Sequence, residues 1–467
     1  MLSKTDFLMF LDAPMHLWAK AHGALEVEVL TAYEQHLVQQ GQQVETVARE
    51  FIETTLAAQY SHAEVLWQHP FDDGEYKIRA DALIHDLNAD VYDLYEIKSS
   101  TSVQTKHEYD MTFQVLLLET LLPLRHVSIL HIDKNYRHQI KMETAGFFSV
   151  EDVSDKVEKR RSDVDEWRRA ARAIMEMDKP EPSFACTRPR TCPCLSLCHP
   201  DLPNHPIYEI PYIGKKAVQL REMGITAIAE IPSTFNLNPK QRKHYQAAKS
   251  GKPLIDNQAI RDTLSRLQFP FYFLDYETFN PAVPLFNGYR PYEHIVFQYS
   301  LFVIQNPDDE PLHYDCLLVG PEDPAPKIVP HLLRNIGEKG SVIVWNQSFE
   351  KGRNLDLADH CPAFSNQLLG INERLYDLML IFREGHYVHP DFHGSASLKV
   401  VLPVLCPDLG YEELAISNGE EAMLTWARIQ HGEISAEQHP EIEVAMREYC
   451  KRDTFGMVAI WEQLRKL

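Results

Sequence analysis

The chain reads FYFLDYET over residues 271–278, an apolar run that ends in two acidic side chains. The apolar part, residues 271–274, is typical of a buried strand. Asp275 and Glu277 close that run. The sequence therefore predicts a buried strand that carries two carboxylates at its end.

Further acidic positions follow this strand. Glu350 ends the stretch VIVWNQSFE, and Tyr449 and Asp453 lie in EYCKRDT. The spacing Y-x-x-x-D is one helical turn, so both side chains share a helix face. Carboxylates from separate elements can hold two divalent ions about 4 Å apart, which activate a water and stabilise the leaving oxygen of a phosphodiester. The expected ligands of Mg²⁺ or Mn²⁺ are Asp275, Glu277, Glu350 and Asp453.

These three motifs, in this order, resemble those of the DnaQ-like 3′–5′ exonucleases in their tyrosine (DEDDy) form. Asn346-x-x-x-Glu350 matches the second motif, with Glu where the family usually has Asp. The resemblance covers residues 265–467 and implies an RNase H-like fold that hydrolyses phosphodiester bonds. It also implies that Tyr449 positions the attacking water. Because the ordinary pKa of a tyrosine hydroxyl is near 10, we expect Tyr449 to orient this water rather than to act as a base. The alternative is a set of ordinary surface acids at strand ends.

A second group of charged side chains lies among the first 200 residues. The stretches IRADALIHD and DVYDLYEIKSS are expected to form a strand hairpin, with Asp81 in the first strand and Glu96 and Lys98 in the second. The three side chains would gather at one end of a sheet. Asp81 and Glu96 would bind Mg²⁺, and Lys98 would orient the attacking water or help to deprotonate it. The alternative is an exposed, charged strand end.

Gln114 follows on an apolar helix, FQVLLLETLL. This order resembles the PD-(D/E)XK nucleases, and specifically the RecB-like branch that includes CRISPR-associated nucleases with an iron–sulfur cluster. The opening SKTDFLMFLDAPMHLW is similar to the first helix of that branch. The branch also has a histidine on an early helix. His22 and Glu26 are both candidates for that position.

Four of the eight cysteines fall close together, at Cys186, Cys192, Cys194 and Cys198. Thiolates this near in sequence need little loop closure to meet at one metal centre. Their spacing lacks the C-x-x-C knuckles of most zinc sites, and iron–sulfur clusters also take four thiolates. The RecB-like resemblance favours a [4Fe–4S] cluster, with zinc as the alternative. Ala13 stands where that branch has a cysteine, so Cys186 is one candidate to replace it.

Residues 210–232, between the two nuclease-like parts, resemble a helix-hairpin-helix segment. Residues 213–216 would form a tight turn whose N–H groups meet a phosphate, backed by Lys215 and Lys216. Residues 201–260 hold more basic than acidic side chains. The alternative is a plain helical linker. Further on, the histidines and Lys399 of the loop at residues 386–403 are candidates to contact substrate.

Length and charge set the outer limits. A chain of 467 residues is expected to hold two or three domains. We place them at residues 1–200, 201–260 and 261–467, in an α/β protein with a PD-(D/E)XK restriction-endonuclease-like domain, a helical connector and an RNase H-like domain. No apolar run reaches the roughly 18 residues of a membrane span, and the N-terminus does not read as a secretory signal, so we expect a cytoplasmic protein.

The net charge of −21 argues against a simple nucleic-acid binder with a basic groove. It permits a nuclease, because bound metal ions offset the acids of an active site. The sequence therefore predicts a nuclease with two active sites, acting on DNA ends or single strands in repair, recombination or antiphage defence. The alternatives are a binding or assembly component with one inactive site, and a 3′–5′ exoribonuclease.

Overall fold

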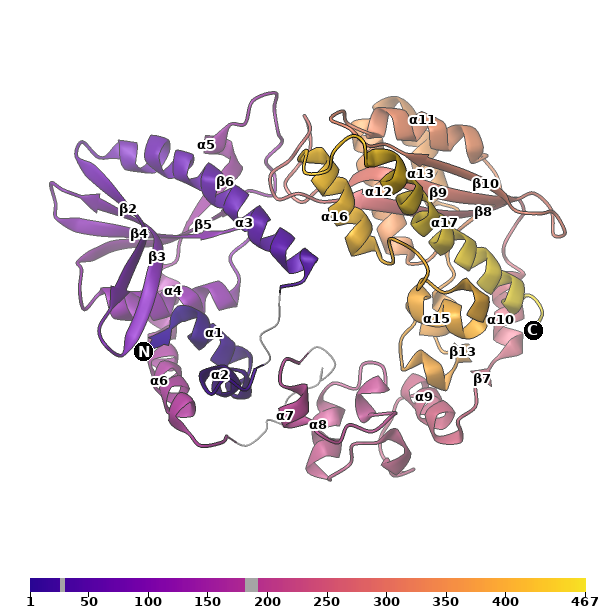
Figure 1. The fold of residues 1–467 in the computed structure, drawn as a ribbon, viewed down its shortest axis with the longest axis horizontal. Helices are drawn as coiled ribbons and strands as arrows, with labels where there is room; N and C mark the ends of the chain where they lie inside the picture. The colour runs from indigo at the N-terminus through magenta and orange to yellow at the C-terminus, as the bar shows by residue number, and fades with distance from the viewer. Residues whose placement is uncertain (26–29, 181–191) are drawn as a thin grey trace. The chain divides into compact units, whose positions relative to one another are not determined.

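The computed structural model describes residues 1–25, 30–180 and 192–467 (Figure 1). The chain is a mixed α/β protein with two mixed β-sheets and helices on their faces. It divides into two compact units. The first comprises residues 1–200 and 281–292, and the second comprises residues 201–280 and 293–467.

The sheet of the first unit is built around a long hairpin. Its order is β1-β3-β4-β5-β6, and β2 pairs with the remaining side of β3. The strands β2, β3 and β4 are antiparallel neighbours, and β4 and β5 are parallel. The predicted hairpin is confirmed as β3 and β4. The strands are β1 (Leu2–Ser3), β2 (Ala63–Asp72), β3 (Tyr76–Asp86), β4 (Val91–Lys98), β5 (Leu124–Ile132) and β6 (Phe148–Asp152).

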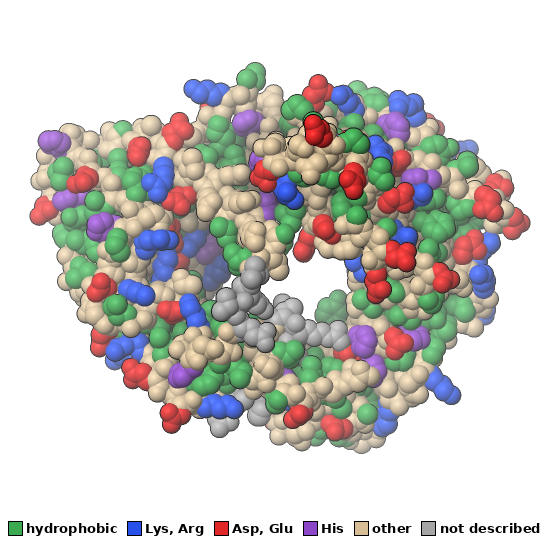
Figure 2. Space-filling model, viewed as in Figure 1, with side chains coloured by type: hydrophobic (Ala, Val, Ile, Leu, Met, Phe, Trp, Pro, Cys, Tyr) green, Lys and Arg blue, Asp and Glu red, His purple; other side chains and the backbone are tan. Residues whose placement is uncertain are grey.

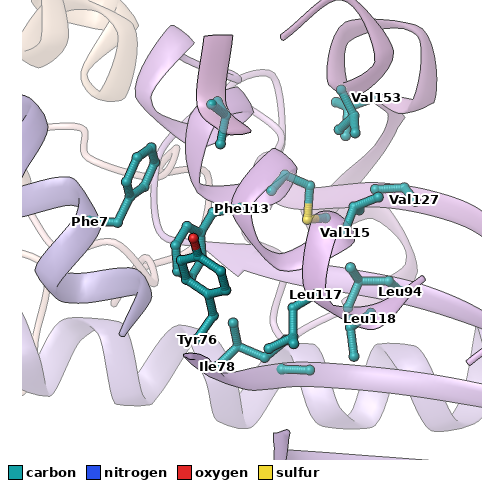
Figure 3. Close-up of a cluster of buried hydrophobic side chains, with 14 of the residues drawn as sticks. Phe7, Tyr76, Ile78, Leu94, Phe113, Val115, Leu117, Leu118, Val127 and Val153 are labelled. Atoms are coloured by element: carbon teal, nitrogen blue, oxygen red, sulfur yellow. The ribbon is translucent and has the colours of Figure 1, made fainter. Parts of the chain in front are cut away.

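Helices cover both faces of this sheet (Figure 1). One face packs against α3, and the other packs against α1, α4 and α6. Figure 3 shows the second of these cores, where the rings of Phe7 and Phe113 stack with centroids 4.9 Å apart. The helices of this unit are α1 (Lys4–Asp12), α2 (Pro14–Ala21), α3 (Ala32–Phe51), α4 (Thr105–Leu118), α5 (Thr144–Phe147), α6 (Ser154–Glu176) and α7 (Leu195–Cys198).

The segment 281–292 completes the core under α3, although it lies far along the sequence. Ala282 is fully buried in that core, and its N–H donates a hydrogen bond of 3.0 Å to Gln40 Oε1 on α3. The Tyr292 hydroxyl donates to the carbonyl of Ser99, the residue after β4. The first unit therefore takes part of its core from beyond residue 261.

The second unit has a five-stranded sheet of order β10-β9-β8-β11-β12. The strands β10, β9 and β8 are antiparallel neighbours, whereas β8, β11 and β12 run parallel. A short antiparallel pair, β7 (Leu254–Ile255) with β13 (Tyr387–Val388), lies outside this sheet. The main strands are β8 (Phe271–Phe279), β9 (Ile295–Ile304), β10 (Leu312–Leu317), β11 (Ser341–Val344) and β12 (Leu375–Asp377).

Alternation along β8 separates its two faces. Tyr272, Leu274 and Tyr276 belong to the core with α11 (Ala325–Asn335), α12 (Gln347–His360) and α13 (Ser365–Asn372). On the opposite face, Phe271 contacts Trp461 of α17 (His439–Leu464), with ring centroids 5.4 Å apart. Because alternate side chains of a strand share a face, Asp275 and Glu277 lie on the side of α17. The strand predicted from residues 271–278 is confirmed.

The connector region has a small apolar core of its own, which includes Ile213, Leu220 and Ile228. Residues 210–232 contain one α-helix, α8 (Lys215–Glu222), rather than the two expected of a helix-hairpin-helix. Gly224 adopts a φ of 75° and ends that helix, and a 3₁₀ turn, η5 (Ile228–Glu230), follows. The next helix is α9 (Pro239–Ser250).

The remaining helices of the second unit are α10 (Asn257–Leu264), α14 (Leu380–Arg383), α15 (Leu398–Leu405) and α16 (Gly419–Gln430). None of the helices in the described ranges is both long and apolar enough to cross a membrane.

Candidate active sites

The first candidate site lies where β8 meets α17 in the second unit. Asp275 and Glu277 come from the strand, and Tyr449, Cys450 and Asp453 come from the helix. One ligand atom from each of Asp275, Glu277 and Cys450 lies within 4.8 Å of the other two. The Cys450 thiol is 3.9 Å from Asp275 Oδ2. The structure thus brings the first and third sequence motifs together.

The carboxylates of this site have raised pKa values. Removal from water and the nearby charge of Asp453 raise the pKa of Asp275. Burial and then Asp275 raise the pKa of Glu277, and the same two causes raise that of Glu350. Burial also raises the pKa of Asp453. Because the charge of Asp275 raises the pKa of Glu350, Glu350 on α12 belongs to the same electrostatic cluster.

Lys399 is a positive charge near these acids, but it forms no ion pair with them in the described part of the chain. None of Asp275, Glu277, Glu350 and Asp453 forms an ion pair there, and Glu350 Oε2 is buried without a hydrogen-bond partner. A buried polar atom without a partner costs about 1–3 kcal/mol. Oxygen ligands are those that Mg²⁺ and Mn²⁺ prefer, so this donor set fits such ions.

Two tyrosines and a lysine border the acids. The Tyr411 hydroxyl donates a hydrogen bond to Asp453 Oδ1. Lys399 Nζ, on α15, lies 5.0 Å from the centroid of the Tyr449 ring and 5.5 Å from that of Tyr411. Burial and the charge of Asp453 raise the pKa of Tyr449 far above its ordinary value. Tyr449 therefore keeps its proton and acts as a donor. Sequence reasoning missed Tyr411, which lies outside any recognisable motif.

Asp377 supports the helix that carries Glu350. It is buried, and its Oδ1 accepts hydrogen bonds of 3.1 Å from the backbone N–H groups of Asn346 and Met379. Asn346 precedes α12 with a φ of 94°, a strained conformation for a residue other than glycine. Asp377 therefore positions the start of α12.

The second candidate site lies in the first unit, where β3, β4 and α4 meet. Lys98 Nζ donates to Glu96 Oε1 at 2.8 Å, and Gln114 Nε2 donates to Glu96 Oε2 at 2.8 Å. Asp81 Oδ2 accepts a hydrogen bond of 3.0 Å from the backbone of Ile97. The four residues singled out from the sequence thus lie together.

Two further residues complete this charged group. Lys4 Nζ lies 2.7 Å from Glu96 Oε1, and Lys98 Nζ lies 2.6 Å from Asp110 Oδ2. Gln114 also donates to Asp110 Oδ1 at 3.1 Å. Sequence reasoning missed both Lys4 and Asp110. The signal for Asp110 was its place one helical turn before Gln114, which puts both on one face of α4.

The pKa values of Glu96, Asp81 and Lys98 are shifted in different directions by burial and by the charges around them. Burial opposes the charged form of Glu96, but Lys98 and Lys4 outweigh it and lower the pKa of Glu96. Burial and the neighbouring Glu96 raise the pKa of Asp81 to about 7. Burial alone would lower the pKa of Lys98, but Glu96 and Asp110 raise it. Lys98 is therefore a charged hydrogen-bond donor in this environment.

A cavity of about 410 Å³ opens beside Asp81. Gln68 Nε2 joins Asp81 to Glu45 of α3, at 3.3 Å from Asp81 Oδ1 and 3.1 Å from Glu45 Oε1. Glu45 therefore adds a carboxylate from an early helix, which sequence reasoning also missed. Of the two early candidates, His22 stacks on Trp18, and Glu26 lies outside the described residues. The cavity is lined by Gly41, Val44, Glu45, Gln68, Arg79, Asp81, Ile97 and Ser99.

Three of the four clustered cysteines lie against α2. Cys192, Cys194 and Cys198 join an apolar cluster with Met15 and Trp18 of that helix. The Cys194 thiol lies 3.7 Å from the carbonyl of Met15, two residues after the alanine that replaces the expected cysteine. Cys186 lies outside the described residues. Three cysteines that share one cluster are compatible with either an iron–sulfur cluster or zinc as the bound group.

The two lysines of the connector differ in their surroundings. Lys215 is exposed at the first position of α8. Lys216 Nζ donates to Gln241 Oε1 at 2.9 Å, so it is held by α9. Acidic and basic side chains are interspersed over the face of the molecule drawn in Figure 2. Because Lys215 is exposed and Lys216 is held by α9, Lys215 is the better placed of the two to meet a phosphate.

Comparisons with known proteins find relatives without an assigned activity. Residues 272–397 match a family model described as a domain of unknown function, DUF2779. The chain is 25% identical over 270 residues to uncharacterized protein MG366 of Mycoplasma genitalium, covering 53% of this chain and 40% of that protein. It is 27% identical over 248 residues to the MG366 homolog of Mycoplasma pneumoniae, covering 49% and 37%. The chain thus spans about two-fifths of these curated relatives. No solved structure matches.

Proposed function

We propose that the protein is a metal-dependent nuclease with two hydrolytic sites. The observation that carries the proposal is the cluster of Asp275, Glu277, Glu350 and Asp453. These acids come from one strand and two helices, and burial raises the pKa of each. The charge of another acid of the cluster also raises the pKa values of Asp275, Glu277 and Glu350, and Glu350 has a buried oxygen without a partner. Structural acids at strand ends would be expected to find basic partners or solvent.

In the second unit, the four carboxylates would hold Mg²⁺ or Mn²⁺. Such ions, when bound, activate a water and stabilise the leaving oxygen of a phosphodiester. Tyr449 keeps its proton and would orient the attacking water through its hydroxyl. Lys399 supplies a positive charge beside the acids, where it would contact a phosphate of the substrate. The strand order and the three motifs support an RNase H-like exonuclease domain of the DEDDy type.

In the first unit, Asp81 and Glu96 would hold Mg²⁺ or Mn²⁺, with Glu45 as a further ligand from α3. The succession α3, β2, β3, β4, α4, β5 supports a PD-(D/E)XK fold of the RecB-like branch. Lys98 is held in its charged form by Glu96 and Asp110. We therefore assign it to orienting the water and stabilising negative charge, rather than to removing a proton.

The cysteines would hold a [4Fe–4S] cluster, with zinc as the alternative. Their burial against α2 supports a structural role, in which the metal centre pins the end of the first unit to its opening helices. The expected substrate is DNA, as ends or single strands, in repair, recombination or antiphage defence in the cytoplasm. An exoribonuclease, or an assembly component with one weakened site, is the alternative.

The test is cleavage of end-labelled single- and double-stranded DNA and RNA with Mg²⁺, Mn²⁺ or EDTA. Lys98→Ala is expected to reduce one cleavage pattern about 100-fold or more, because it removes a positive charge that stabilises developing negative charge. Asp453→Asn should remove the other, and the double variant should cut nothing. Lys106→Ala and Asp408→Asn, at exposed positions, are the matched controls. If neither single variant changes any product, or no substrate is cut with either ion, the proposal fails. Cleavage of RNA alone would favour the exoribonuclease.

A further inference from the structure

A third group of ligand-type side chains lies in the second unit, outside both carboxylate sites. It consists of His205, Glu209 and His393, and one ligand atom of each lies within 4.8 Å of the other two. The two histidines are separated by most of the second unit in sequence and meet on one carboxylate. We propose that these three residues bind a transition-metal ion of the zinc type.

The spacing of the donor atoms suits such an ion. His205 Nδ1 lies 2.9 Å from Glu209 Oε2, and His393 Nδ1 lies 2.9 Å from Glu209 Oε1. A tetrahedral ion with bonds of about 2.1 Å has ligand atoms about 3.4 Å apart. A small opening of the two contacts would therefore admit the ion. Two imidazoles with one carboxylate are ligands typical of zinc, whereas Mg²⁺ prefers oxygen alone.

The carboxylate of this group is more deeply buried than the two imidazoles. Glu209 is only 5% exposed, while the side chains of His205 and His393 are 24% and 38% exposed. The carboxylate is thus held inside, and the imidazoles reach it from the solvent side. A water from that side would supply the fourth ligand, as in zinc sites with three protein ligands.

The backbone is shaped to bring His393 to Glu209. His393 adopts a φ of 48°, in the left-handed region that residues other than glycine rarely occupy. Gly394 follows with a φ of 75°, and a Cβ there would lie 1.7 Å from the carbonyl oxygen of Glu209. Only glycine permits this approach. Unfavourable backbone geometry held in place by its surroundings is a frequent feature of binding sites.

The ion would join two parts of the second unit. Glu209 ends the short turn η4 (Ile207–Glu209) in the connector, and His393 lies in the loop that leads into α15. Because α15 carries Lys399, the ion would also fix the approach of that lysine to the carboxylate cluster. This role is independent of the Mg²⁺ or Mn²⁺ proposed for catalysis.

The competing explanation is a hydrogen-bonded triad without metal, in which each imidazole donates one N–H to Glu209. Metal content distinguishes the two. We would dialyse the full chain against Zn²⁺, remove loosely bound ions, and count zinc by mass spectrometry. Wild type should retain one more equivalent than Glu209→Gln or His393→Ala. His389→Ala, in the same loop, is the control and should match wild type, because among the described residues its Nδ1 contacts the neighbouring Asp391 and not Glu209.

Equal zinc in wild type and Glu209→Gln would overturn the proposal. Glu209→Gln keeps the size of the side chain and can still hydrogen-bond, and circular dichroism would check that it folds. A crystal of the wild-type protein soaked in Zn²⁺ gives a second measurement that needs no variant. An anomalous peak between His205, Glu209 and His393 is expected there, and its absence would also refute the site.

Discussion

The hydroxyl of Tyr411 donates a hydrogen bond to the carboxylate of Asp453, across the second-unit site. This bond lowers the pKa of Asp453 and so opposes the rise that burial causes. Together with a hydrogen bond from Tyr449, it fixes the orientation of the carboxylate. Tyr411 is therefore a positioning residue for a proposed metal ligand.

Tyr411→Phe is expected to weaken the metal dependence of the second-unit activity. Loss of a hydrogen bond to a ligating carboxylate typically costs about 10–100-fold in metal affinity or activity. The measurement is the Mg²⁺ or Mn²⁺ concentration that gives half-maximal cleavage, which should rise for Tyr411→Phe. Tyr449→Phe should instead lower the maximal rate at saturating metal. If both variants changed the same parameter equally, the separate role of Tyr411 would be wrong.

Glu350→Gln is expected to stabilise the metal-free protein at alkaline pH. The pKa of Glu350 is raised in the folded state, so the folded protein holds its proton more tightly than the unfolded chain does. The free energy of unfolding therefore falls as pH rises from the pKa of Glu350 in the unfolded chain to its higher pKa in the folded protein. The glutamine removes this titration, with an expected gain of about 1–3 kcal/mol at pH 8 in EDTA.

Thermal melts at pH 5 and pH 8, with EDTA or Mn²⁺, would measure this effect. Wild type should gain more from Mn²⁺ at pH 8 than Glu350→Gln does. Glu373→Gln, an exposed glutamate of the same unit, is the matched control and should behave as wild type. A lower melting temperature for Glu350→Gln in EDTA at pH 8 would contradict the prediction.

Gly419→Ala tests the space beside the acids. A Cβ at position 419 would lie 3.6 Å from the Tyr449 hydroxyl and 3.7 Å from Glu277 Oε2, which are ordinary contacts. The methyl group should therefore leave the fold intact but occupy room needed by water and substrate. We expect cleavage by the second unit to fall about 10-fold or more with little change in melting temperature.

Gly370→Ala is the matched control for this change, because Gly370 is also helical and a Cβ there meets nothing within 4 Å. It should retain full cleavage. Wild-type activity in Gly419→Ala would show that this glycine lies outside the reacting region.

Tyr292→Phe tests the contribution of residues 281–292 to the first unit. It removes the hydrogen bond to the carbonyl of Ser99, next to Lys98, at an expected cost of about 1 kcal/mol. Hydrogen exchange at residues 96–99 should accelerate, and first-unit cleavage should fall less than in Lys98→Ala. Tyr33→Phe, at an exposed position, is the control. Unchanged exchange at residues 96–99 would argue that the segment does not support β4.

The local features of this protein were readable from its sequence. An apolar run ending in two acids predicted β8, because a buried strand needs continuous apolar side chains. The spacing of Tyr449 and Asp453 placed both on one helix face, because that spacing is one helical turn. Asp81, Glu96 and Lys98 were likewise placed by the patterns of two adjacent strands. In each case the pattern spans only a few residues.

Only the tertiary structure decided which residues far apart in the sequence come into contact. Glu45 reaches Asp81 through Gln68, Tyr411 reaches Asp453, and His205 and His393 meet at Glu209. No local periodicity records these contacts, because each depends on how separate elements pack. The place of residues 281–292 in the first unit has the same origin. The sequence by itself determined several strands and helices and the acidic side chains that they carry. Packing determined which partners orient those acids, because burial brings together side chains that are far apart along the chain.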